Sequence, residues 1–217
     1  EREGESTGGR RPSLLNINKE KIGQVLGVYF APTFVQITCG DIDGSIFSTR
    51  RYRLGDLGVE IIEETEKIIE KELKKNKKIK VISVVMNGLV DGEKGISIFS
   101  PHYNTKNIPI VDRFQKKFKK KVYIENDVRA MALVEKVFGE CKKNYNFVVL
   151  NVEVGVGGSI YLNDMLYHGY GSMSGELGHM VVKRNSLEKC SCGKRGCLET
   201  EVSNRAIIKK IMTQIRI

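Results

Sequence analysis

Three cysteines lie within eight residues of one another, at Cys190, Cys192 and Cys197. A disulfide framework spreads its cysteines over distant loops, whereas a tight cluster is typical of a metal site. Thiolates are preferred ligands of Zn²⁺, and the glycines between the last two cysteines allow the backbone to turn tightly enough for both to reach one ion. We therefore expect this segment to bind zinc.

The fourth ligand has to come from elsewhere in the chain. Of the three histidines, His102, His168 and His179, the last is the nearest to the cluster. Three thiolates and one imidazole complete a tetrahedral shell without an open position, so the expected zinc is structural and not catalytic. A redox-active thiol pair is one alternative. A nucleic-acid-binding zinc ribbon is another, but ribbons carry two Cys-x2-Cys pairs and this chain has none. Cys39 and Cys141 are expected to be plain reduced thiols.

The elements that must position this cluster alternate between strands and helices. Alternating apolar residues predict strands, and apolar residues three and four apart predict helices. In the first part of the chain we expect strands at 22–30, 34–39 and 45–54, a helix at 56–75, a strand at 79–86, a glycine-rich loop, a helix near 110–120, a strand at 121–125 and a helix at 127–138. In the second part we expect strands at 147–152, 159–162 and 180–183 and a final helix at 201–216. This order predicts an α/β layered fold, and the three-stranded opening of each part hints at a duplication.

Composition limits the class of protein. Apolar residues make up 41% of the 217, enough for a core. No apolar run approaches the roughly 20 residues of a membrane helix and no signal peptide opens the chain, so we expect a soluble, cytoplasmic protein. The net charge of +10 is concentrated at 71–80 and 116–121, which favours polyanions or simply marks two solvated helix ends. Neither stretch interleaves aromatic residues as a single-strand binder would.

Two motifs connect the chain to a known family. Residues 175–179 read Gly-Glu-Leu-Gly-His, and residues 190–199 read Cys-Ser-Cys-Gly-Lys-Arg-Gly-Cys-Leu-Glu. Together they closely resemble the signature of the ROK family of bacterial sugar kinases and sugar-responsive repressors. The resemblance runs from about Gly8 to the end of the chain. It implies the duplicated actin/hexokinase-like (ribonuclease H-like) α/β fold, with a cleft between two domains.

The same resemblance implies a division of the chain. Residues 1–20 would be a linker from a winged-helix DNA-binding module that precedes them, because Gly8–Ser13 is similar to the segment that joins the two parts in ROK repressors. Residues 21–126 would form the first α/β domain. Residues 127–217 would form the second, which carries the zinc site and would be incomplete at its C-terminal end.

Sugar-binding residues are implied in the same way. In the family's kinases the position of Asp127 is the general base that deprotonates the accepting hydroxyl. His179 would place one ring nitrogen on zinc and the other toward the sugar. Asp127 could instead be only the N-cap of the helix that follows it. The full set implied to bind sugar is Gly88, His102, Asn126, Asp127, Glu176, His179 and Glu199.

Phosphate binding is where the chain departs from the kinases. Their first strand pair carries a pattern like Asp-x-Gly-Gly-Thr, but here Tyr29 stands at the acid and Ala31-Pro32 at the glycine pair. Proline removes a backbone donor, and side chains block close approach of a phosphate. Their second loop, Gly-Thr-Gly-x-Gly-Gly, begins here with Glu153, whose carboxylate would repel a nucleotide. We therefore expect no enzymatic activity and no catalytic residue.

Three functions follow from these patterns. The first is the sugar-sensing part of a ROK transcriptional repressor of carbohydrate-utilisation genes, with a monosaccharide effector (glucose, xylose or an N-acetylated hexosamine) in the cleft. It would bind operator DNA through the upstream module and form a homodimer or larger homo-oligomer. The second is an ATP-dependent ROK sugar kinase with unusual phosphate contacts. The third is a zinc-stabilised interaction protein whose cleft is vestigial.

Overall fold

The computed structural model describes residues 2–3, 13–14, 18–53, 58 and 60–215. Most of the predicted linker, residues 1–20, lies outside the described residues. Its described parts are β1 (Arg2–Glu3), β2 (Ser13–Leu14), which pairs with β1 antiparallel, and the start of the short helix α1 (Lys19–Ile22). The sequence predicted that the first long strand begins at Ile22. Instead, Ile22 is the last residue of helix α1.

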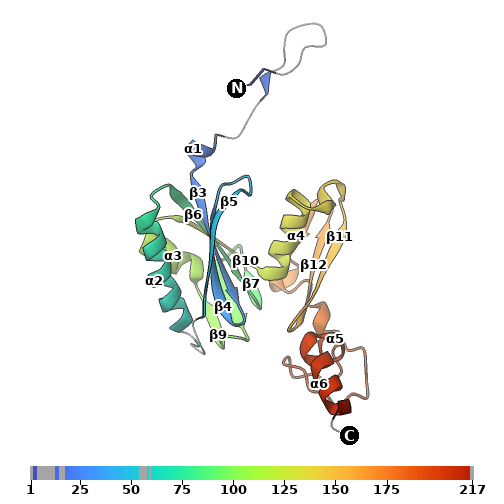
Figure 1. The fold of residues 1–217 in the computed structure, drawn as a ribbon. Helices are drawn as coiled ribbons and strands as arrows, with labels where there is room; N and C mark the ends of the chain where they lie inside the picture. Colours follow the sequence, from blue (N-terminus) through green and yellow to red (C-terminus); the bar gives the residue numbers. More distant parts are fainter. Residues whose placement is uncertain (1, 4–12, 15–17, 54–57, 59, 216–217) are drawn as a thin grey trace, which may run out of the picture.

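A five-stranded mixed sheet forms the larger layer (Figure 1). Its strand order is β10-β6-β3-β4-β5, with β10, β6 and β3 parallel and β3, β4 and β5 joined as antiparallel neighbours. The alternation of buried and half-buried residues along β3 and β4 reproduces the period of two seen in the sequence. The five strands are β3 (Gln24–Ala31), β4 (Phe34–Gly40), β5 (Ile46–Tyr52), β6 (Ile79–Met86) and β10 (Lys121–Asn126).

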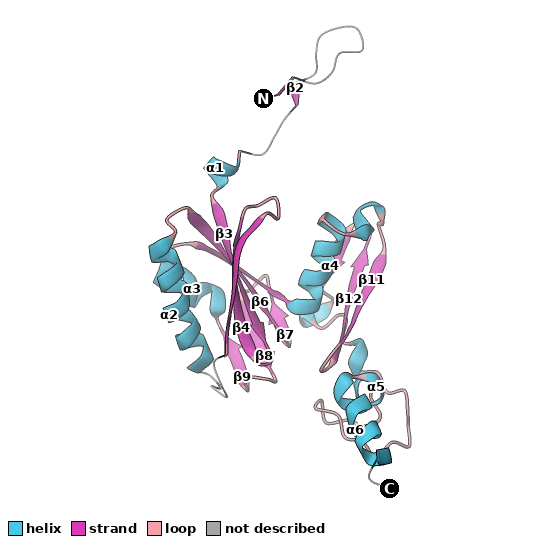
Figure 2. Cartoon of the chain, in the orientation of Figure 1, coloured by secondary structure: helices cyan, strands magenta, loops and turns pink. Residues whose placement is uncertain are grey.

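Helices α2 (Glu60–Lys75) and α3 (Ile110–Phe118) cover one side of this sheet (Figure 2). Ile62 and Ile69 of α2 and Phe114 of α3 are fully buried with the sheet's apolar residues in one continuous core. Buried Glu66 joins the two helices, because it accepts hydrogen bonds from Arg113 Nε at 2.5 Å and Lys117 Nζ at 2.8 Å. The predicted α/β layer is therefore present in this part of the chain.

The segment expected to be a glycine-rich loop folds into a small antiparallel sheet. Its strands are β7 (Leu89–Asp91), β8 (Ile96–Ser100) and β9 (Thr105–Ile108). The sequence missed them because each has only three to five residues. Asn104 and Asn107 also adopt positive φ, so turn residues interrupt the pattern.

A second sheet follows helix α4 (Asp127–Val137) and is formed by β11 (Phe147–Val152), β12 (Val156–Leu162) and β13 (Met165–Tyr167). All three strands run antiparallel, and β13 was not predicted. Helix α4 contacts β11 and β12 on one side and β10 on the other, so it lies between the two sheets (Figure 1).

The end of the chain differs from its prediction in two ways. The expected strand at 180–183 is only a single bridge between Val181 and Cys197. The expected single helix at 201–216 is two helices, α5 (Leu198–Val202) and α6 (Asn204–Ile215). The chain breaks at Ser203, whose φ of −65° and ψ of 156° are extended. No described helix combines the length and apolar character needed to cross a membrane.

Candidate functional site

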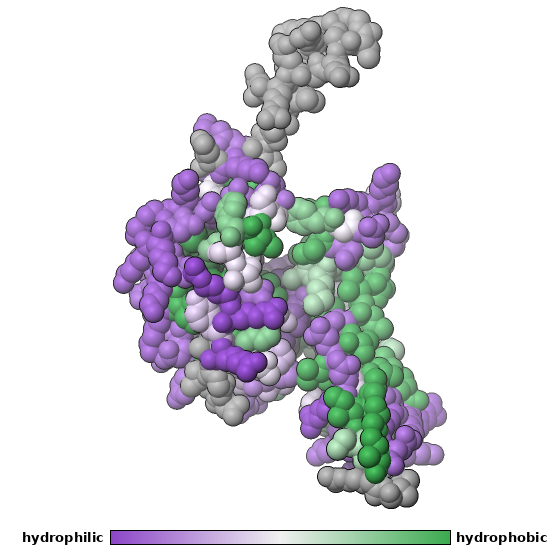
Figure 3. Space-filling model, in the orientation of Figure 1, coloured by the Kyte–Doolittle hydropathy of each residue, from purple (hydrophilic) through white to green (hydrophobic). Residues whose placement is uncertain are grey.

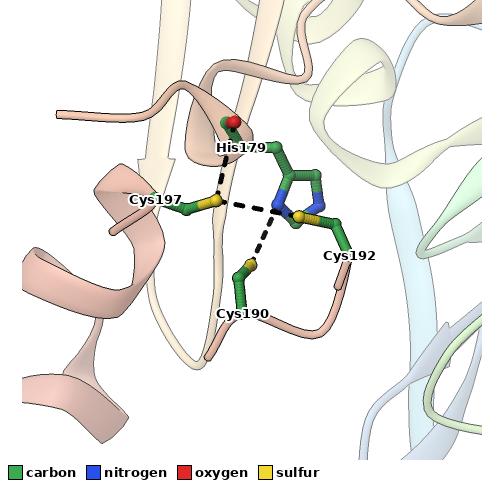
Figure 4. A group of neighbouring side chains, drawn as sticks. All are labelled: His179, Cys190, Cys192 and Cys197. Carbon is green, nitrogen blue, oxygen red and sulfur yellow. Dashed lines mark hydrogen bonds between the residues drawn. The ribbon is translucent and has the colours of Figure 1, made fainter. Parts of the chain in front are cut away.

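The four predicted metal ligands converge on one point (Figure 4). The ligand atoms of His179, Cys190, Cys192 and Cys197 all lie within 4.8 Å of one another. Cys192 Sγ lies 3.7 Å from Cys197 Sγ, and Cys190 Sγ lies 3.3 Å from His179 Nδ1. A tetrahedron with zinc–sulfur bonds of about 2.3 Å has sulfur–sulfur edges of about 3.8 Å. The cluster could therefore hold a metal ion, and its donors and spacing fit Zn²⁺.

Local backbone geometry brings these ligands together. His179 ends a 3-10 turn, Leu177–His179, while Cys197 caps α5 and forms the bridge to Val181. Gly196 has a φ of +69°, and a Cβ there would lie 1.9 Å from the carbonyl oxygen of Lys183. Only glycine allows the chain to pass this close, so the cluster depends on this turn as well as on its cysteines.

Two carboxylates lie next to this cluster of histidine and cysteine side chains. Glu176 Oε2 lies 3.7 Å from His179 Nε2, whereas the other ring nitrogen, Nδ1, lies near Cys190 Sγ. Glu199 Oε1 lies 3.5 Å from Ser191 Oγ, and its Oε2 accepts a hydrogen bond from the Val156 amide at 3.1 Å. Glu199 therefore connects the cysteine-containing loop to Val156, the first residue of β12.

A pocket of about 970 Å³ lies beside the cluster and has walls from both main sheets. One wall is formed at the carboxyl ends of the parallel strands β3, β6 and β10, where ligands of open α/β sheets usually bind. The segments around residues 101–102, 151–158, 172–179 and 188–191 and helices α5 and α6 form the rest. The structure brings every residue implied to bind sugar into the lining of this one pocket: Gly88, His102, Asn126, Asp127, Glu176, His179 and Glu199. Their role as sugar ligands remains a prediction.

The start of α4 corrects one interpretation of the sequence. Asn126, and not Asp127, is the N-cap, because its Oδ1 accepts hydrogen bonds from the amides of Val128 at 3.0 Å and Arg129 at 3.1 Å. Asp127 is the first helical residue, and Asn126 Nδ2 donates to its Oδ1 at 3.0 Å. The amide of Val128 is shared with Asp127 Oδ1, also at 3.0 Å, so the carboxyl group of Asp127 is held in the pocket lining through this oxygen.

The environment of Asp127 changes its acidity. Burial raises its pKa to about 6, and the charge of nearby Glu153 acts in the same direction, while hydrogen bonds from the amide of Val128 and from Asn126 oppose the shift. This carboxyl group therefore exchanges its proton near neutral pH, in the range useful for accepting a hydroxyl proton or hydrogen bond.

Three of the four residues expected to depart from the kinase pattern also line this pocket. They are Tyr29, Pro32 and Glu153, whereas Ala31 is buried in the core outside the lining. Burial raises the pKa of Tyr29, and the charges of Asp127 and Glu153 raise it further, so the phenol stays neutral beside two carboxyl groups. The region that meets Asp127 from this side is acidic and aromatic.

Arg129 is a pocket residue that sequence reasoning missed. It is only 2% exposed, and its guanidinium donates to Glu125 Oε1 at 2.7 Å, to the Ser172 carbonyl at 3.0 Å and to the Val90 carbonyl. Glu125 also lies 3.2 Å from His168 Nε2. The available signal was an arginine on the apolar face of the predicted helix, because a charge there must have partners.

Known proteins are similar to this chain in sequence and in fold. The sequence model of the ROK family matches residues 25–216. The xylose repressor of Bacillus spizizenii is 33% identical over 98% of this chain and 56% of its own length. The DNA-binding transcriptional dual regulator NagC of Escherichia coli is 28% identical over 97% of this chain and 53% of its own length. The chain thus spans about half the length of these curated relatives.

Solved structures agree at the level of the fold. A ROK family transcriptional regulator described as a homologue of the E. coli MLC protein superposes with a TM-score of 0.82 at 28% identity, covering 89% of this chain and 50% of that one. A ROK family glucokinase from Streptomyces griseus, solved with glucose and AMPPNP, gives 0.79 at 24% identity, covering 89% and 62%. The resemblance inferred from residues 175–199 is confirmed by the match of almost the whole chain: the protein belongs to the ROK family.

Proposed function

We propose that this chain is the sugar-sensing part of a ROK-family transcriptional repressor and that it lacks kinase activity. The observation that carries the proposal is the lining of one pocket by all seven residues that the family pattern assigns to sugar. Relatives named as a repressor at 33% identity and as a transcriptional dual regulator at 28% identity support the regulatory role over a metabolic one.

The pocket offers the chemistry that a monosaccharide needs. Vicinal hydroxyl groups both donate and accept, and they pair well with carboxylates, amides and imidazoles. Asp127, Glu176 and Glu199 supply acceptors, and His102 supplies a ring nitrogen that can donate. Asn126 would act by holding Asp127, because its Nδ2 already donates to Asp127 Oδ1 and to the Gly88 carbonyl. We assign the effector to this pocket, treated as the cleft between a first domain at 21–126 and a second at 127–217.

A structural zinc ion would act indirectly. Held by His179, Cys190, Cys192 and Cys197, it would supply a fixed, charged cross-link for the 175–200 segment. That segment presents Glu176 and Glu199 to the pocket, so their positions would depend on the cross-link. The ring nitrogen of His179 that does not bind zinc would face the pocket, next to the carboxylate of Glu176.

The lack of kinase activity is supported by residues that share the pocket lining with Asp127. Pro32 offers no amide to a phosphate, and Glu153 would place a negative charge against one. Binding of operator DNA through an upstream module, assembly into a homodimer or larger homo-oligomer and control of xylose or other carbohydrate genes belong to this same proposal.

A panel of sugars measured by thermal shift and calorimetric titration tests it. Xylose, glucose and N-acetylglucosamine are compared, and a sugar at about 100 times its Kd stabilises the fold by about 2.7 kcal/mol. Asp127→Ala should weaken the affinity about ten- to hundredfold, because charged hydrogen bonds contribute roughly 1.5–3 kcal/mol each. Glu140→Ala, on an exposed carboxylate outside the pocket lining, is the control and should leave affinity unchanged.

Two results would overturn the assignment. Unchanged affinity in both Asp127→Ala and Glu176→Ala would place the ligand elsewhere. Sugar-dependent ATP turnover that disappears in Asp127→Ala would make the chain a kinase.

A further inference from the structure

The amino ends of the three parallel strands form one edge of the five-stranded sheet, opposite the pocket. Gln24 at the start of β3 pairs with Ile79, and its amide donates to the Lys78 carbonyl at 2.9 Å. On the other side of β6, Val81 pairs with Lys121 at the start of β10. Lysines that are distant in sequence therefore become neighbours along this edge.

Five exposed lysines define what we call the basic edge: Lys77, Lys78, Lys80, Lys119 and Lys121. They belong to segments 71–80 and 116–121, which together contain eleven lysines and one glutamate. The net charge of these sixteen residues is 11 − 1 = +10, the same as that of the whole chain. The rest of the protein is neutral overall, so the positive field originates here.

Helix ends and ion pairs explain only part of this charge. Lys75 pairs with Glu72 and Lys117 with Glu66, and lysines in the last turns of α2 and α3 complement the helix dipoles. Within the described residues, no lysine of the basic edge forms an ion pair, and Lys77, Lys78, Lys80 and Lys121 lie beyond the helix ends. Two acidic residues, Asp41 and Asp43, lie on the turn between β4 and β5. Asp43 is paired with Lys19, and the charge of Asp41 also acts on Lys19, whose pKa both raise.

The five lysines of the basic edge have a charge density similar to that of the phosphates of a nucleic acid duplex. Neighbouring strands lie about 4.8 Å apart, so three strands span about 10 Å. A duplex carries one phosphate charge per about 1.7 Å of its axis, or roughly six over that distance. Phe118, the single aromatic residue of the two segments, is buried, so no ring there is available for stacking on unpaired bases.

We propose that the basic edge binds the phosphate backbone of duplex DNA without reading its sequence. This contact would add to any sequence-specific binding by a separate module. The proposal rests on the proposed regulatory function, because that function would bring a DNA duplex close to this chain. It assigns a direct DNA contact to the sensor portion itself.

Fluorescence anisotropy of the 217-residue chain with a labelled random-sequence duplex, from 50 to 200 mM salt, tests the proposal. The edge variant replaces four lysines by glutamine: Lys77→Gln, Lys78→Gln, Lys119→Gln and Lys121→Gln. The control removes the same charge at four exposed lysines elsewhere: Lys67→Gln, Lys106→Gln, Lys142→Gln and Lys143→Gln.

The edge variant should lose about tenfold or more in affinity at low salt. Its plot of log affinity against log salt should flatten by about 3, because each neutralised phosphate contributes about 0.9 to the slope. The control should lose less than about threefold. Equal losses in both variants would show that net charge alone drives binding, and no binding at 50 mM salt would also overturn the proposal. Tighter binding to vesicles containing phosphatidylserine than to the duplex would assign the edge to a membrane surface instead.

Failure of this proposal and of the sensor assignment can be told apart. The sugar-induced thermal shift is measured on the edge variant as well, and it should be unchanged because the pocket is at the other end of the strands. A chain that needs the basic edge for duplex binding but responds to no sugar would retain this inference and lose the proposed function.

Discussion

The two main sheets of this protein are stabilised in different ways. Around the five-stranded sheet, twenty buried apolar residues between Leu26 and Ile124 form one continuous cluster. Around the second sheet many apolar side chains are exposed, including Val148 at 58%, Leu150 at 53% and Leu187 at 87%. Figure 3 shows this contrast as hydrophobic surface over β11, β12 and α6 and hydrophilic surface over α2.

The difference predicts that the second region depends on the cluster of His179, Cys190, Cys192 and Cys197. Among the described residues after 140, five apolar side chains are buried, and two of these are the ligands Cys190 and Cys197. The others are Val156, Tyr161 and Ala206. Burial of apolar surface therefore stabilises the first region, whereas few such contacts hold the 175–200 segment in place without a bound ion.

Removing the metal should have the largest effect and should be confined to the second region. Structural zinc contributes apparent binding free energies of about 10–16 kcal/mol in zinc-finger peptides at pH 7. We expect Cys197→Ser to abolish metal binding and to increase amide exchange across 175–200, while the five-stranded sheet stays protected. Elemental analysis and hydrogen exchange measure the two effects.

Cys141 provides the matched control for the metal prediction. It is a free, partly exposed thiol outside the cluster, so Cys141→Ser should keep one zinc ion per chain. Wild-type protein purified with far less than one zinc ion per chain would contradict the prediction.

The next prediction compares the truncation of a buried side chain in the first region with the truncation of an exposed side chain in the second. Phe114→Ala opens a cavity in the core and should lower the free energy of unfolding by about 3–5 kcal/mol. Leu150→Ala removes an exposed side chain and should change it by less than about 0.5 kcal/mol. Urea denaturation measures both. A large loss in Leu150→Ala would mean that this face is covered in solution.

Apart from the Leu150→Ala comparison, the smallest expected effect is a pH dependence that originates at Asp127. Because burial raises its folded pKa to about 6 from an ordinary value near 3.8, its contribution to stability is fully present below about pH 4. That contribution is lost as the pH rises through 6, and amounts to at most about 3 kcal/mol for a shift of about two units. Asp127→Asn removes this loss, so its stability relative to wild type should increase between pH 4 and pH 7.

Denaturant unfolding at pH 4, 5, 6 and 7 checks this expectation, with zinc held constant. Asp112→Asn, on an exposed face of α3, is the control and should run parallel to wild type. A parallel profile for Asp127→Asn would show that its carboxyl group is solvated in the folded protein.

Local spacing in the sequence was enough to predict the metal cluster and most long strands. Cys190, Cys192 and Cys197 are close in sequence, so their convergence needs only short turns. Strands β6 and β11 were predicted at their observed bounds because alternation over six to eight residues is a strong signal. The approach of His179 was inferred from proximity, and it succeeded because a 3-10 turn directs its ring toward Cys190.

What the sequence missed depends on tertiary context. Strands β7 to β9 are too short to show a period. The break at Ser203 separates α5 from α6 without a proline or glycine to mark it. Asn126 and Asp127 are both good caps, and only the fold decides that Asn126 takes this role. The pocket lining was predicted through family motifs, because no periodicity places Gly88 beside Glu199.

Strand β6 separates the pocket from the basic edge by its whole length. Its eight residues extend over roughly 26 Å at about 3.3 Å each. Electrostatic interactions between exposed charges decay over a Debye length of about 8 Å at physiological ionic strength. The sugars proposed as effectors carry no charge, and a change of charge at the pocket residues would be almost completely screened before it reached a phosphate at the other end. Any communication between the two has to be mechanical, transmitted as a displacement of the sheet.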